Sequence, residues 1–250
     1  MKRIESVNNP QVKLWKKLVQ QKKARDKEGQ YLVEGIHLVE EAIEAKKAEV
    51  IIVTEGVEYP HEWVEESEII EVTLAIGKQL ADTDTSQLVF ALCKKETRPF
   101  YDATGKQFLL LDAVQDPGNV GTLIRTADAA GMDAVVIGKG SADPFSPKVL
   151  RAAQGSTFHL PIYQLELDEA FHSLDCLQVP IYATGWTKSA KPYKEVVPEE
   201  SFALIVGNEG QGVSPYYMER ADHIVYIPMP GKAESLNVGI AAGVIMFHYN

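Results

Sequence analysis

The sequence predicts an α/β protein of two domains, and three observations lead to this expectation. The chain has 250 residues, which is more than one average domain and enough for a large core. Hydrophobic residues make up 45% and charged residues 24%, the balance of an ordinary globular protein. Short apolar runs typical of buried strands alternate with segments of helical periodicity, which indicates a mostly parallel sheet covered by helices on both faces.

Residues 1–96 are expected to form the first domain. The stretch "SVNNPQVKLWKKLVQQKKARDK" begins with cap-forming residues and Pro10, and its apolar residues recur at helical spacing. It therefore predicts one amphipathic, basic helix. Further along, strands are expected near residues 32–33, 50–53, 69–72 and 88–93, with a helix over 38–45 and a short helix between the last two strands.

A linker is expected over 97–106, because "ETRPFYDATGK" contains Pro99, Gly105 and polar residues between two apolar regions. Residues 107–250 then restart the alternation as a second domain. Its expected strands are "FLLLDAV", "DAVVIG", "IYATG", "FALIVGNEG" and "HIVYIPM". Its expected helices are "NVGTLIRTADAAG", "SPKVLRAAQG", "PYYMERA" and the apolar closing segment.

The net charge of −10 is unevenly distributed along the chain. Residues 1–27 hold nine basic and two acidic side chains, a local charge of +7, so the remainder carries −17. Because contacts to nucleic-acid phosphates need Lys and Arg, we interpret the first helix as a basic contact surface, with a solvated Lys-rich helix as the alternative. The candidate contact residues are Lys13, Lys16, Lys17, Lys22, Lys23 and Arg25.

Neither a metal site nor a membrane segment is expected. Cys93 and Cys176 lie far apart without metal or redox spacing, so we expect them to be reduced and structural, and the six histidines show no ligand spacing. The longest nearly uncharged apolar stretch, residues 238–247, is half the roughly 20 residues needed to span a bilayer. With no apolar leader at the start, these features predict a cytoplasmic protein.

Three loops follow predicted strands, at the edge where open α/β sheets bind ligands. They are "DAVQDPGNVGTLIRTADAAG", "IVGNEGQGVSP" and "IPMPGKAESLNVGIAAGVIMFH". The glycine-rich loop around Glu209 lacks a phosphate-binding fingerprint, and its carboxylate favours a cationic or neutral ligand, or orients Arg125.

Taken singly, the polar residues of these loops have plain structural alternatives. Glu209 has the alternative of a turn residue, and Arg125 that of a surface ion pair. Asn119, Ser235 and Asn237 have the alternative of helix caps. Their joint occurrence on three ligand-side loops favours a shared site.

These loops resemble, in this order, the signature motifs of SpoU/TrmH-type RNA 2′-O-ribose methyltransferases, of the SPOUT superfamily. The similarity extends to "SPKVLRAAQGSTFHLPI" and covers most of residues 108–250. The segment "YLVEGIHLVEEAI" is similar to the L30e-like substrate-binding domain of two-domain members. The resemblance implies an RNA-binding domain over 1–96 and a methyltransferase domain over 107–250, with RNA as the partner and ribosomal RNA favoured over transfer RNA.

The resemblance also implies a deep trefoil knot in the second domain and a homodimer formed through it. S-adenosylmethionine (AdoMet) is the implied cofactor, bound in the knotted loops. Small residues would suit a final helix crowded by neighbouring backbone; they are Gly231, Gly239, Ala241, Ala242 and Gly243.

By resemblance, Arg125 is the catalytic arginine, assisted by Asn119, Glu209, Ser235 and Asn237. Because a guanidinium titrates above about 12, we expect Arg125 to grip the RNA phosphate and stabilise the developing alkoxide, oriented by Glu209, and not to act as a base. Ser235 and Asn237 would hold the ribose hydroxyl. The implied AdoMet-binding residues are Thr184, Gly185, Gly207, Ile227 and Leu236.

Two other functions stay open at this point. The chain is alternatively a catalytically inactive RNA-binding or ribosome-assembly factor of the same fold, although the presence of all five polar residues argues against this. A nucleotide-dependent enzyme such as a dehydrogenase is the other alternative, and the absence of a dinucleotide fingerprint argues against it.

Overall fold

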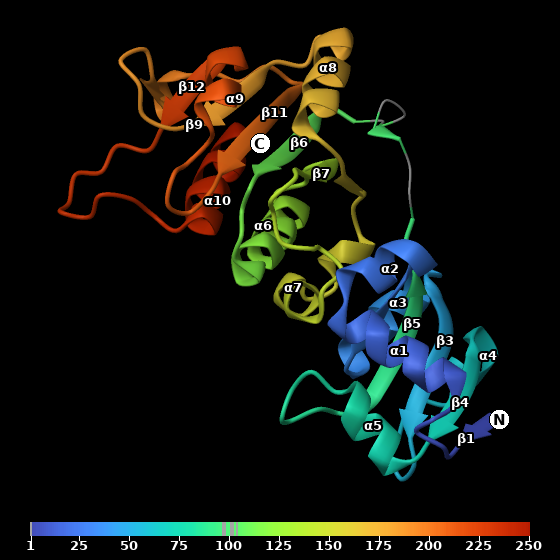
Figure 1. Cartoon of the computed structure of the whole chain (residues 1–250). Helices are drawn as coiled ribbons and strands as arrows, with labels where there is room; N and C mark the ends of the chain where they lie inside the picture. Colours follow the sequence, from blue (N-terminus) through green and yellow to red (C-terminus); the bar gives the residue numbers. More distant parts are fainter. Residues whose placement is uncertain (1, 97–98, 101–102, 104) are drawn as a thin grey trace. The chain divides into compact units, whose positions relative to one another are not determined.

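The computed structural model describes residues 2–96, 99–100, 103 and 105–250, without the side chains of residues 65 and 66. The chain divides into two α/β units (Figure 1). The first comprises Met1–Glu96 and Phe145–His159, and the second Thr97–Pro144 and Leu160–Asn250. Of the expected linker, residues 97–98, 101–102 and 104 lie outside the described residues, whereas Phe100 packs into the core of the second unit.

The first unit is built on a five-stranded sheet of order β1-β4-β3-β5-β2. Its strands are β1 (Lys2–Ile4), β2 (Gln30–Glu34), β3 (Ala48–Thr54), β4 (Glu68–Val72) and β5 (Val89–Lys94). Strand β4 runs parallel to β1 and β3, and β5 runs antiparallel to β2 and β3. Its helices are α1 (Pro10–Gln20), α2 (Lys22–Glu28), α3 (Ile36–Glu44), α4 (Trp63–Glu66), α5 (Leu74–Leu80) and α7 (Pro147–Ala153), with a 3-10 turn η2 (Ser156–Phe158).

Side chains of this sheet alternate between two apolar cores, as the twofold period of a strand requires. In β3, Ile51 and Val53 pack on the side of α3 and α7, and Ile52 packs on the side of α1 and α5. Helices therefore cover both faces of the sheet.

The expected basic helix is present but divides into α1 and α2 at Gln21, whose backbone is extended. Asn9 caps α1 by accepting a hydrogen bond from the Gln11 N–H, and Pro10 occupies the first turn. Val12, Trp15 and Leu18 are buried against the sheet. The apolar stripe predicted from the sequence thus docks α1 onto the first unit.

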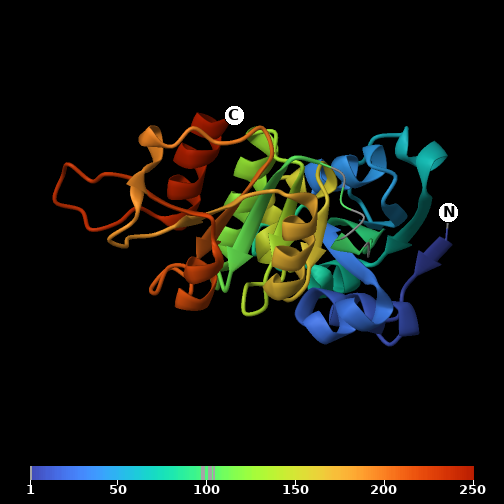
Figure 2. The ribbon, with the colours of Figure 1, turned by 90° about the horizontal axis from the view of Figure 1, so that it is seen from above.

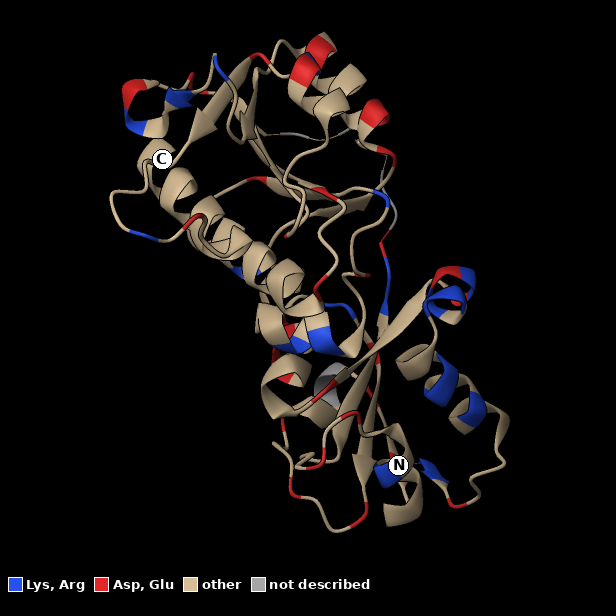
Figure 3. Cartoon of the chain, turned by 60° about the vertical axis from the view of Figure 1, so that its left-hand side comes forward, with Lys and Arg blue, Asp and Glu red and all other residues tan. Residues whose placement is uncertain are grey.

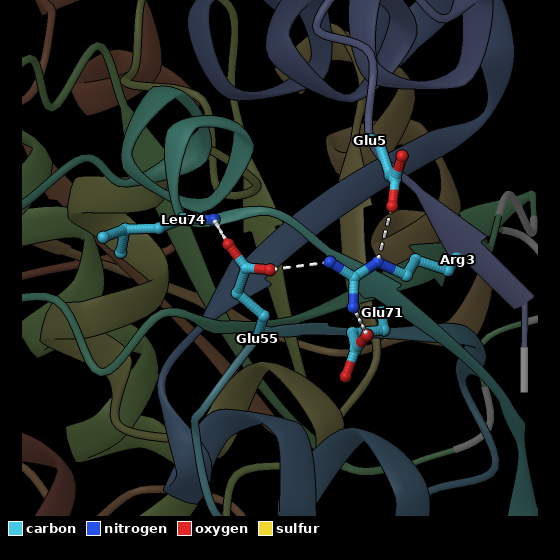
Figure 4. A network of polar contacts seen from close by, with 5 residues as sticks. All are labelled: Arg3, Glu5, Glu55, Glu71 and Leu74. Carbon is cyan, nitrogen blue, oxygen red and sulfur yellow. Dashed lines mark hydrogen bonds and ion pairs between the residues drawn. The ribbon is translucent and has the colours of Figure 1, made fainter.

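Strand β1, which the sequence did not indicate, pairs with β4 at the edge of the sheet. Arg3 of this strand lies 2.8 Å from both Glu55 and Glu71 and 3.1 Å from Glu5 (Figure 4). Three carboxylates therefore surround one of the nine basic groups of residues 1–27. The positive charge available on this segment is lower than the sequence count suggests.

The stretch Phe145–His159, which the sequence suggested for the second domain, packs with the first unit. Phe145 and Leu150 join the core beneath α3, and the rings of Tyr31 and Phe145 lie 4.7 Å apart. His159 Nε2 lies 2.7 Å from a Glu41 carboxylate oxygen. The chain thus passes from one unit to the other three times.

The second unit contains a seven-stranded sheet of order β10-β12-β9-β11-β6-β7-β8, in which every described pairing is parallel. The strands are β6 (Gln107–Asp112), β7 (Ala134–Ile137), β8 (Ile162–Gln164), β9 (Ile181–Thr184), β10 (Lys191–Pro192), β11 (Phe202–Gly207) and β12 (His223–Tyr226). The helices are α6 (Pro117–Ala129), α8 (Leu167–Leu177), α9 (Pro215–Arg220) and α10 (Val238–Tyr249), with a 3-10 turn η3 (Tyr193–Glu195). The predicted α/β class and mostly parallel sheet are confirmed.

Helices cover both faces of this sheet as well (Figures 1 and 2). Phe108 and Leu110 of β6 pack with α8 and α9, whereas Leu109 and Leu111 point to the opposite face, where α6 and α10 lie. Strand order reverses at β6: the chain proceeds to β7 and β8 on one side, then returns to β9 and β11 on the other. Ligands bind at such a switch point in open α/β sheets.

We expect the Trp15→Ala variant to lower the free energy of unfolding of the first unit by about 3 to 5 kcal/mol, because it leaves a cavity where a fully buried ring was. Urea denaturation followed by circular dichroism measures this loss. The exposed neighbour Lys17→Ala is the control and should change stability little. Equal stability of both variants would contradict the docking of α1.

Candidate active site

The three polar loops expected from the sequence meet at the carboxyl edge of the second sheet. Asp112 and Gly207, the last residues of β6 and β11, are paired neighbours, so the loops that follow them start side by side. Strand β12 joins the same sheet through β9. The loop after β12 leads into α10, which packs along α6.

A cavity of about 820 Å³ is lined by the loops after β9, β11 and β12 and by the start of α10. This volume lies within the usual range of about 300–1,000 Å³ for small-molecule sites. Its wall includes all five residues suggested for AdoMet, together with three of those suggested for catalysis. These eight residues are Thr184, Gly185, Gly207, Ile227, Leu236, Glu209, Ser235 and Asn237.

One chain of hydrogen bonds joins the three loops. Asn119 donates from Nδ2 to Glu209 Oε1 at 2.9 Å, and its Oδ1 accepts from Asn237 Nδ2 at 2.8 Å. The Asn237 Oδ1 in turn accepts from the Gly239 and Ile240 N–H groups at the start of α10. Asn237 is therefore both the cap of α10 and a member of the network.

Glu209 is bound by hydrogen bonds on both carboxylate oxygens. Oε2 accepts from the Gln115 N–H at 3.2 Å, and Oε1 accepts from the Asp116 N–H at 3.1 Å as well as from Asn119. Partial burial raises the pKa of this carboxyl, but the hydrogen bonds from Asn119 and from backbone N–H groups outweigh it, so the pKa lies below its ordinary value. Glu209 is therefore ionised at neutral pH.

Asp116 and Asn208 make hydrogen bonds within and between the loops after β6 and β11. Asp116 caps α6 by accepting from the Asn119 N–H at 2.9 Å, so Asn119 is not the helix cap. Asn208 donates to the Ala113 carbonyl at 3.0 Å and accepts from the Gly210 and Gln211 N–H groups. Each loop is thus fixed before any ligand binds.

Two glycines are required by close contacts around the site. A Cβ on Gly207 would lie 2.0 Å from the backbone of Gly212 and Val213, and one on Gly239 would lie 2.9 Å from the Thr122 methyl group. The nearest described neighbours of Gly239 and Gly243 are threonine side chains of α6, with the Asn237 side chain also close to Gly239, and not backbone as expected. A Cβ on Gly231 would meet no described atom within 4 Å, so the expectation of crowding there was wrong.

Arg125 lies apart from this network. It is exposed on α6, does not line the cavity, and makes no ion pair or hydrogen bond with any described residue. The expectation that Glu209 orients Arg125 is corrected, because the described partners of Glu209 are Asn119 and two backbone groups. Ser235 is exposed on the cavity wall within the loop that precedes α10.

Lys and Arg residues recur along the ribbon of α1 and α2 (Figure 3), and their side chains differ in exposure. Lys13, Lys17, Lys22 and Lys23 are exposed, and Lys16 is half-buried with its ammonium 3.4 Å from Gln79. The expectation for Arg25 was wrong, because its side chain is buried and donates to the Leu18 and Val19 carbonyls at the end of α1. Arg25 therefore stabilises the break between the two helices.

Sequence reasoning missed some residues of the cavity wall and its supports. Trp186 and Glu234 line the cavity, and Asp116 and Asn208 fix its loops. Asp followed by Pro at a helix start is a recognisable cap signal for Asp116. Trp186 directly follows "IYATG", and a tryptophan just beyond a strand end was the available signal for it.

The metal, cysteine and membrane expectations can be compared with the described residues. Among the described residues, no group of three or more His, Cys, Asp or Glu is arranged to hold a metal ion. Cys93 is buried in the first unit, which raises its pKa, whereas Cys176 is exposed, so only Cys93 fits the expected structural role. None of the described helices combines the length and the apolarity needed to cross a bilayer.

Comparison with known proteins decides the family. Residues 106–247 match the model of the SpoU rRNA Methylase family, and residues 9–91 match the MRM3-like substrate binding domain. The chain belongs to the SpoU rRNA methylase family. It is 44% identical to 23S rRNA (guanosine(2553)-2′-O)-methyltransferase RlmP of Bacillus subtilis, over 99% of each chain. The resemblance seen in the sequence motifs is thereby confirmed.

Solved structures of this SpoU methylase family share both units. An AdoMet-bound rRNA methyltransferase from Sinorhizobium meliloti superposes with a TM-score of 0.88 at 30% identity, covering 99% of this chain and 97% of that one. AviRb from Streptomyces viridochromogenes in complex with AdoMet superposes with a TM-score of 0.86 at 23% identity, covering 97% of each chain. The second comparison concerns the fold alone.

We expect the Glu209 carboxyl to titrate below its ordinary pKa of 4.5, because the ionised form accepts three hydrogen bonds. The ionised carboxylate then contributes to the free energy of unfolding above pH 4.5. This contribution is lost as the pH falls through the lower pKa of the folded state. A carbon-13 NMR titration of the side-chain carboxyls measures this. Asn119→Ala removes one donor and should move the midpoint upward; a wild-type midpoint at or above 4.5 would contradict the network.

Proposed function

We propose that this SpoU-family methylase transfers the methyl group of AdoMet to a ribose 2′-hydroxyl of ribosomal RNA. The observation that carries the proposal is that the second and third family motifs line one cavity and that Asn119 of the first motif is hydrogen-bonded to both of them. The named activity of the Bacillus subtilis relative, at 44% identity over nearly the whole chain, supports the ribosomal substrate. An inactive RNA-binding factor would not need this polar network, and no observation favours it.

The cavity fits AdoMet in size and charge. None of the described residues on its wall is Lys or Arg, whereas Glu209 and Glu234 are acidic, which suits a sulfonium cation. Backbone at Gly185 and Gly207 offers polar groups without side-chain bulk, and Leu236, Val238 and Ile245 supply apolar surface. When bound, AdoMet supplies an electrophilic methyl group whose leaving group is a neutral thioether, so no metal is required.

We assign Ser235 and the Asn237–Asn119–Glu209 network to the reacting ribose. Methyl transfer needs the donor carbon and the accepting oxygen close together and in line. The Ser235 hydroxyl is exposed on the cavity wall, so it is available to hydrogen-bond a ribose hydroxyl. Asn119 and Asn237 use amide groups to hold one another, which supports a role in fixing the loops around the sugar.

Arg125 is proposed to bind the RNA phosphate and to stabilise the alkoxide that develops at the ribose. Its guanidinium is exposed and has no ion-pair or hydrogen-bond partner among the described residues, so it is available to a phosphate. A preorganised cation of this kind stabilises negative charge without acting as a base. Because no described residue pairs with this guanidinium, we propose that its partner is the phosphate of a bound RNA.

A homodimer through the second unit is proposed to complete this arrangement. On α10, Ile240, Val244 and Phe247 are 57%, 36% and 59% exposed, although the helix is apolar on nearly every face. Arg125 lies on the exposed side of α6, which packs against α10. A second copy covering this helix pair would bury the apolar residues and bring Arg125 to the interface. A trefoil knot, a cytoplasmic location and an RNA-binding role of residues 1–96 are likewise proposed from the family.

We expect Arg125→Ala to lower methyl transfer by about 100-fold or more while AdoMet binds with unchanged affinity, because the guanidinium acts on RNA and on developing charge. The assay follows labelled methyl groups from AdoMet into a transcript that spans guanosine 2553 of 23S rRNA, with mass spectrometric mapping of the ribose. Isothermal titration measures AdoMet binding.

Lys139→Ala, which removes another exposed cation of the second unit, is the matched control and should keep activity. Wild-type protein that binds AdoMet but modifies no ribose would support the inactive RNA-binding alternative. Loss of AdoMet affinity in the Arg125 variant would show that the arginine belongs to the cofactor site.

A variant with Lys13, Lys17, Lys22 and Lys23 changed to Ala should bind the same transcript more weakly, with AdoMet affinity unchanged. If each lysine contacts one phosphate of single-stranded RNA, the slope of log affinity against log salt becomes shallower by about 3. Filter binding across a salt series measures the slope. Replacing the exposed Lys94 and Lys139 instead should leave the slope nearly unchanged, and equal slopes in all three proteins would exclude α1 and α2 as the RNA surface.

A further inference from the structure

Trp186 is the most exposed aromatic residue that lines the cavity. It is 74% exposed, whereas the other two tryptophans, Trp15 and Trp63, are 1% and 4% exposed. It follows Gly185 at the end of β9 and shares the cavity wall with Glu209, Ser235 and Asn237. An exposed indole ring beside a polar site offers a flat π surface on which a planar ligand can stack.

Tyr226 holds Trp186 from one side. Their ring centroids lie 4.6 Å apart at an interplanar angle of 83°, so the two rings meet edge to face. This arrangement fixes the indole ring while most of its surface stays open to solvent. The ring is therefore available as a preorganised stacking surface.

Three lysines follow Trp186 within eight residues in an acidic unit. The second unit has nine basic and seventeen acidic residues, yet "WTKSAKPYK" carries Lys188, Lys191 and Lys194 and no acid. All three are exposed, and none forms an ion pair with a described residue. Unpaired lysines beside an exposed aromatic ring are the combination that binds single-stranded nucleic acid.

A second cavity of about 540 Å³ is lined in part by this loop, but its charge does not suit a phosphate. Lys191, Thr187 and Ser189 line one part of it, and Glu219 and Asp222 line another. Carboxylates there would repel the RNA backbone. The solvent-exposed side of the loop is the favourable path for a strand.

We propose that Trp186 stacks against an RNA base next to the methylated nucleotide, with Lys188, Lys191 and Lys194 contacting the adjoining phosphates. The proposal rests on the RNA substrate of the proposed function and adds a specificity-determining contact in the second unit. Stacking on one face of the indole would hold the strand while the target ribose reaches Ser235. The adenine of AdoMet is an alternative ligand for the ring, and the experiment below distinguishes it from an RNA base.

Tryptophan fluorescence tests the contact directly, because the other two indoles are buried in the first unit. Titration with the transcript that spans guanosine 2553 should quench the emission and protect Trp186 from iodide, whether or not methyl transfer occurs. The Trp186→Phe variant supplies the baseline from the buried tryptophans. AdoMet alone should leave the iodide accessibility of Trp186 nearly unchanged.

Steady-state kinetics measure the contribution of Trp186 to RNA binding. Trp186→Ala should raise the KM for RNA by about tenfold, with little change in kcat or in AdoMet affinity, and Trp186→Phe should retain most of the wild-type KM because a ring remains. Replacing all three lysines by Ala should raise the KM further and reduce its salt dependence. Tyr216→Ala, which removes another exposed aromatic ring of this unit, is the control and should behave as wild type.

The proposal is overturned if RNA neither quenches nor protects Trp186, or if Trp186→Ala leaves the KM for RNA unchanged. It is also overturned if AdoMet alone protects the ring and the Ala variant loses AdoMet affinity, because Trp186 would then be a cofactor residue. Quenching by RNA without any methyl transfer by the wild-type protein would contradict the proposed function and leave the stacking contact supported.

Discussion

The site depends on one carboxamide. Asn119 on α6 donates to Glu209 after β11 and accepts from Asn237 at the start of α10, so its side chain links three segments distant in sequence. Backbone hydrogen bonds to Glu209 and the contact of Asn208 with Ala113 also join the loops after β6 and β11. The orientation of the amide is fixed because its nitrogen faces a carboxylate and its oxygen faces a donor. Close packing of Gly239 against Thr122 brings the two helices near enough for this contact. These contacts hold the loops after β11 and β12 together, and both loops line the cavity.

Acidic and basic side chains occupy different parts of the surface. The cavity wall has carboxylates and no described cation, which suits a sulfonium donor, whereas the cations lie on α1, α2, Arg125 and the loop after Trp186. We propose that RNA binds to these cations and not to the acidic cavity wall. This division explains how a chain of net charge −10 belongs to a family of RNA methylases.

The fold was largely predictable because its signals are local. Apolar strand runs, the 3.6-residue stripe of Val12, Trp15 and Leu18, and the caps before α1 and α10 all lie within short windows. Short edge strands such as β1 and β10 lacked such a signal, and the docking of Phe145–His159 on the first unit depends on long-range packing with Tyr31 and Glu41.

The site was predictable in part. The motif loops identified residues of the cavity wall, but the sequence did not show which hydrogen-bond partner each polar group has. Glu209 binds Asn119 and not Arg125, and Arg25 is used for helix capping, because these choices depend on tertiary geometry.

A double-mutant cycle on Asn119 and Asn237 tests the central claim most directly. Methyl transfer to the 23S transcript is measured at saturating AdoMet for the two single alanine variants and the double variant. If one hydrogen-bonded unit holds the loops, the double variant should lose little more activity than the more damaging single one. Losses that multiply, as for two independent residues, would contradict the account.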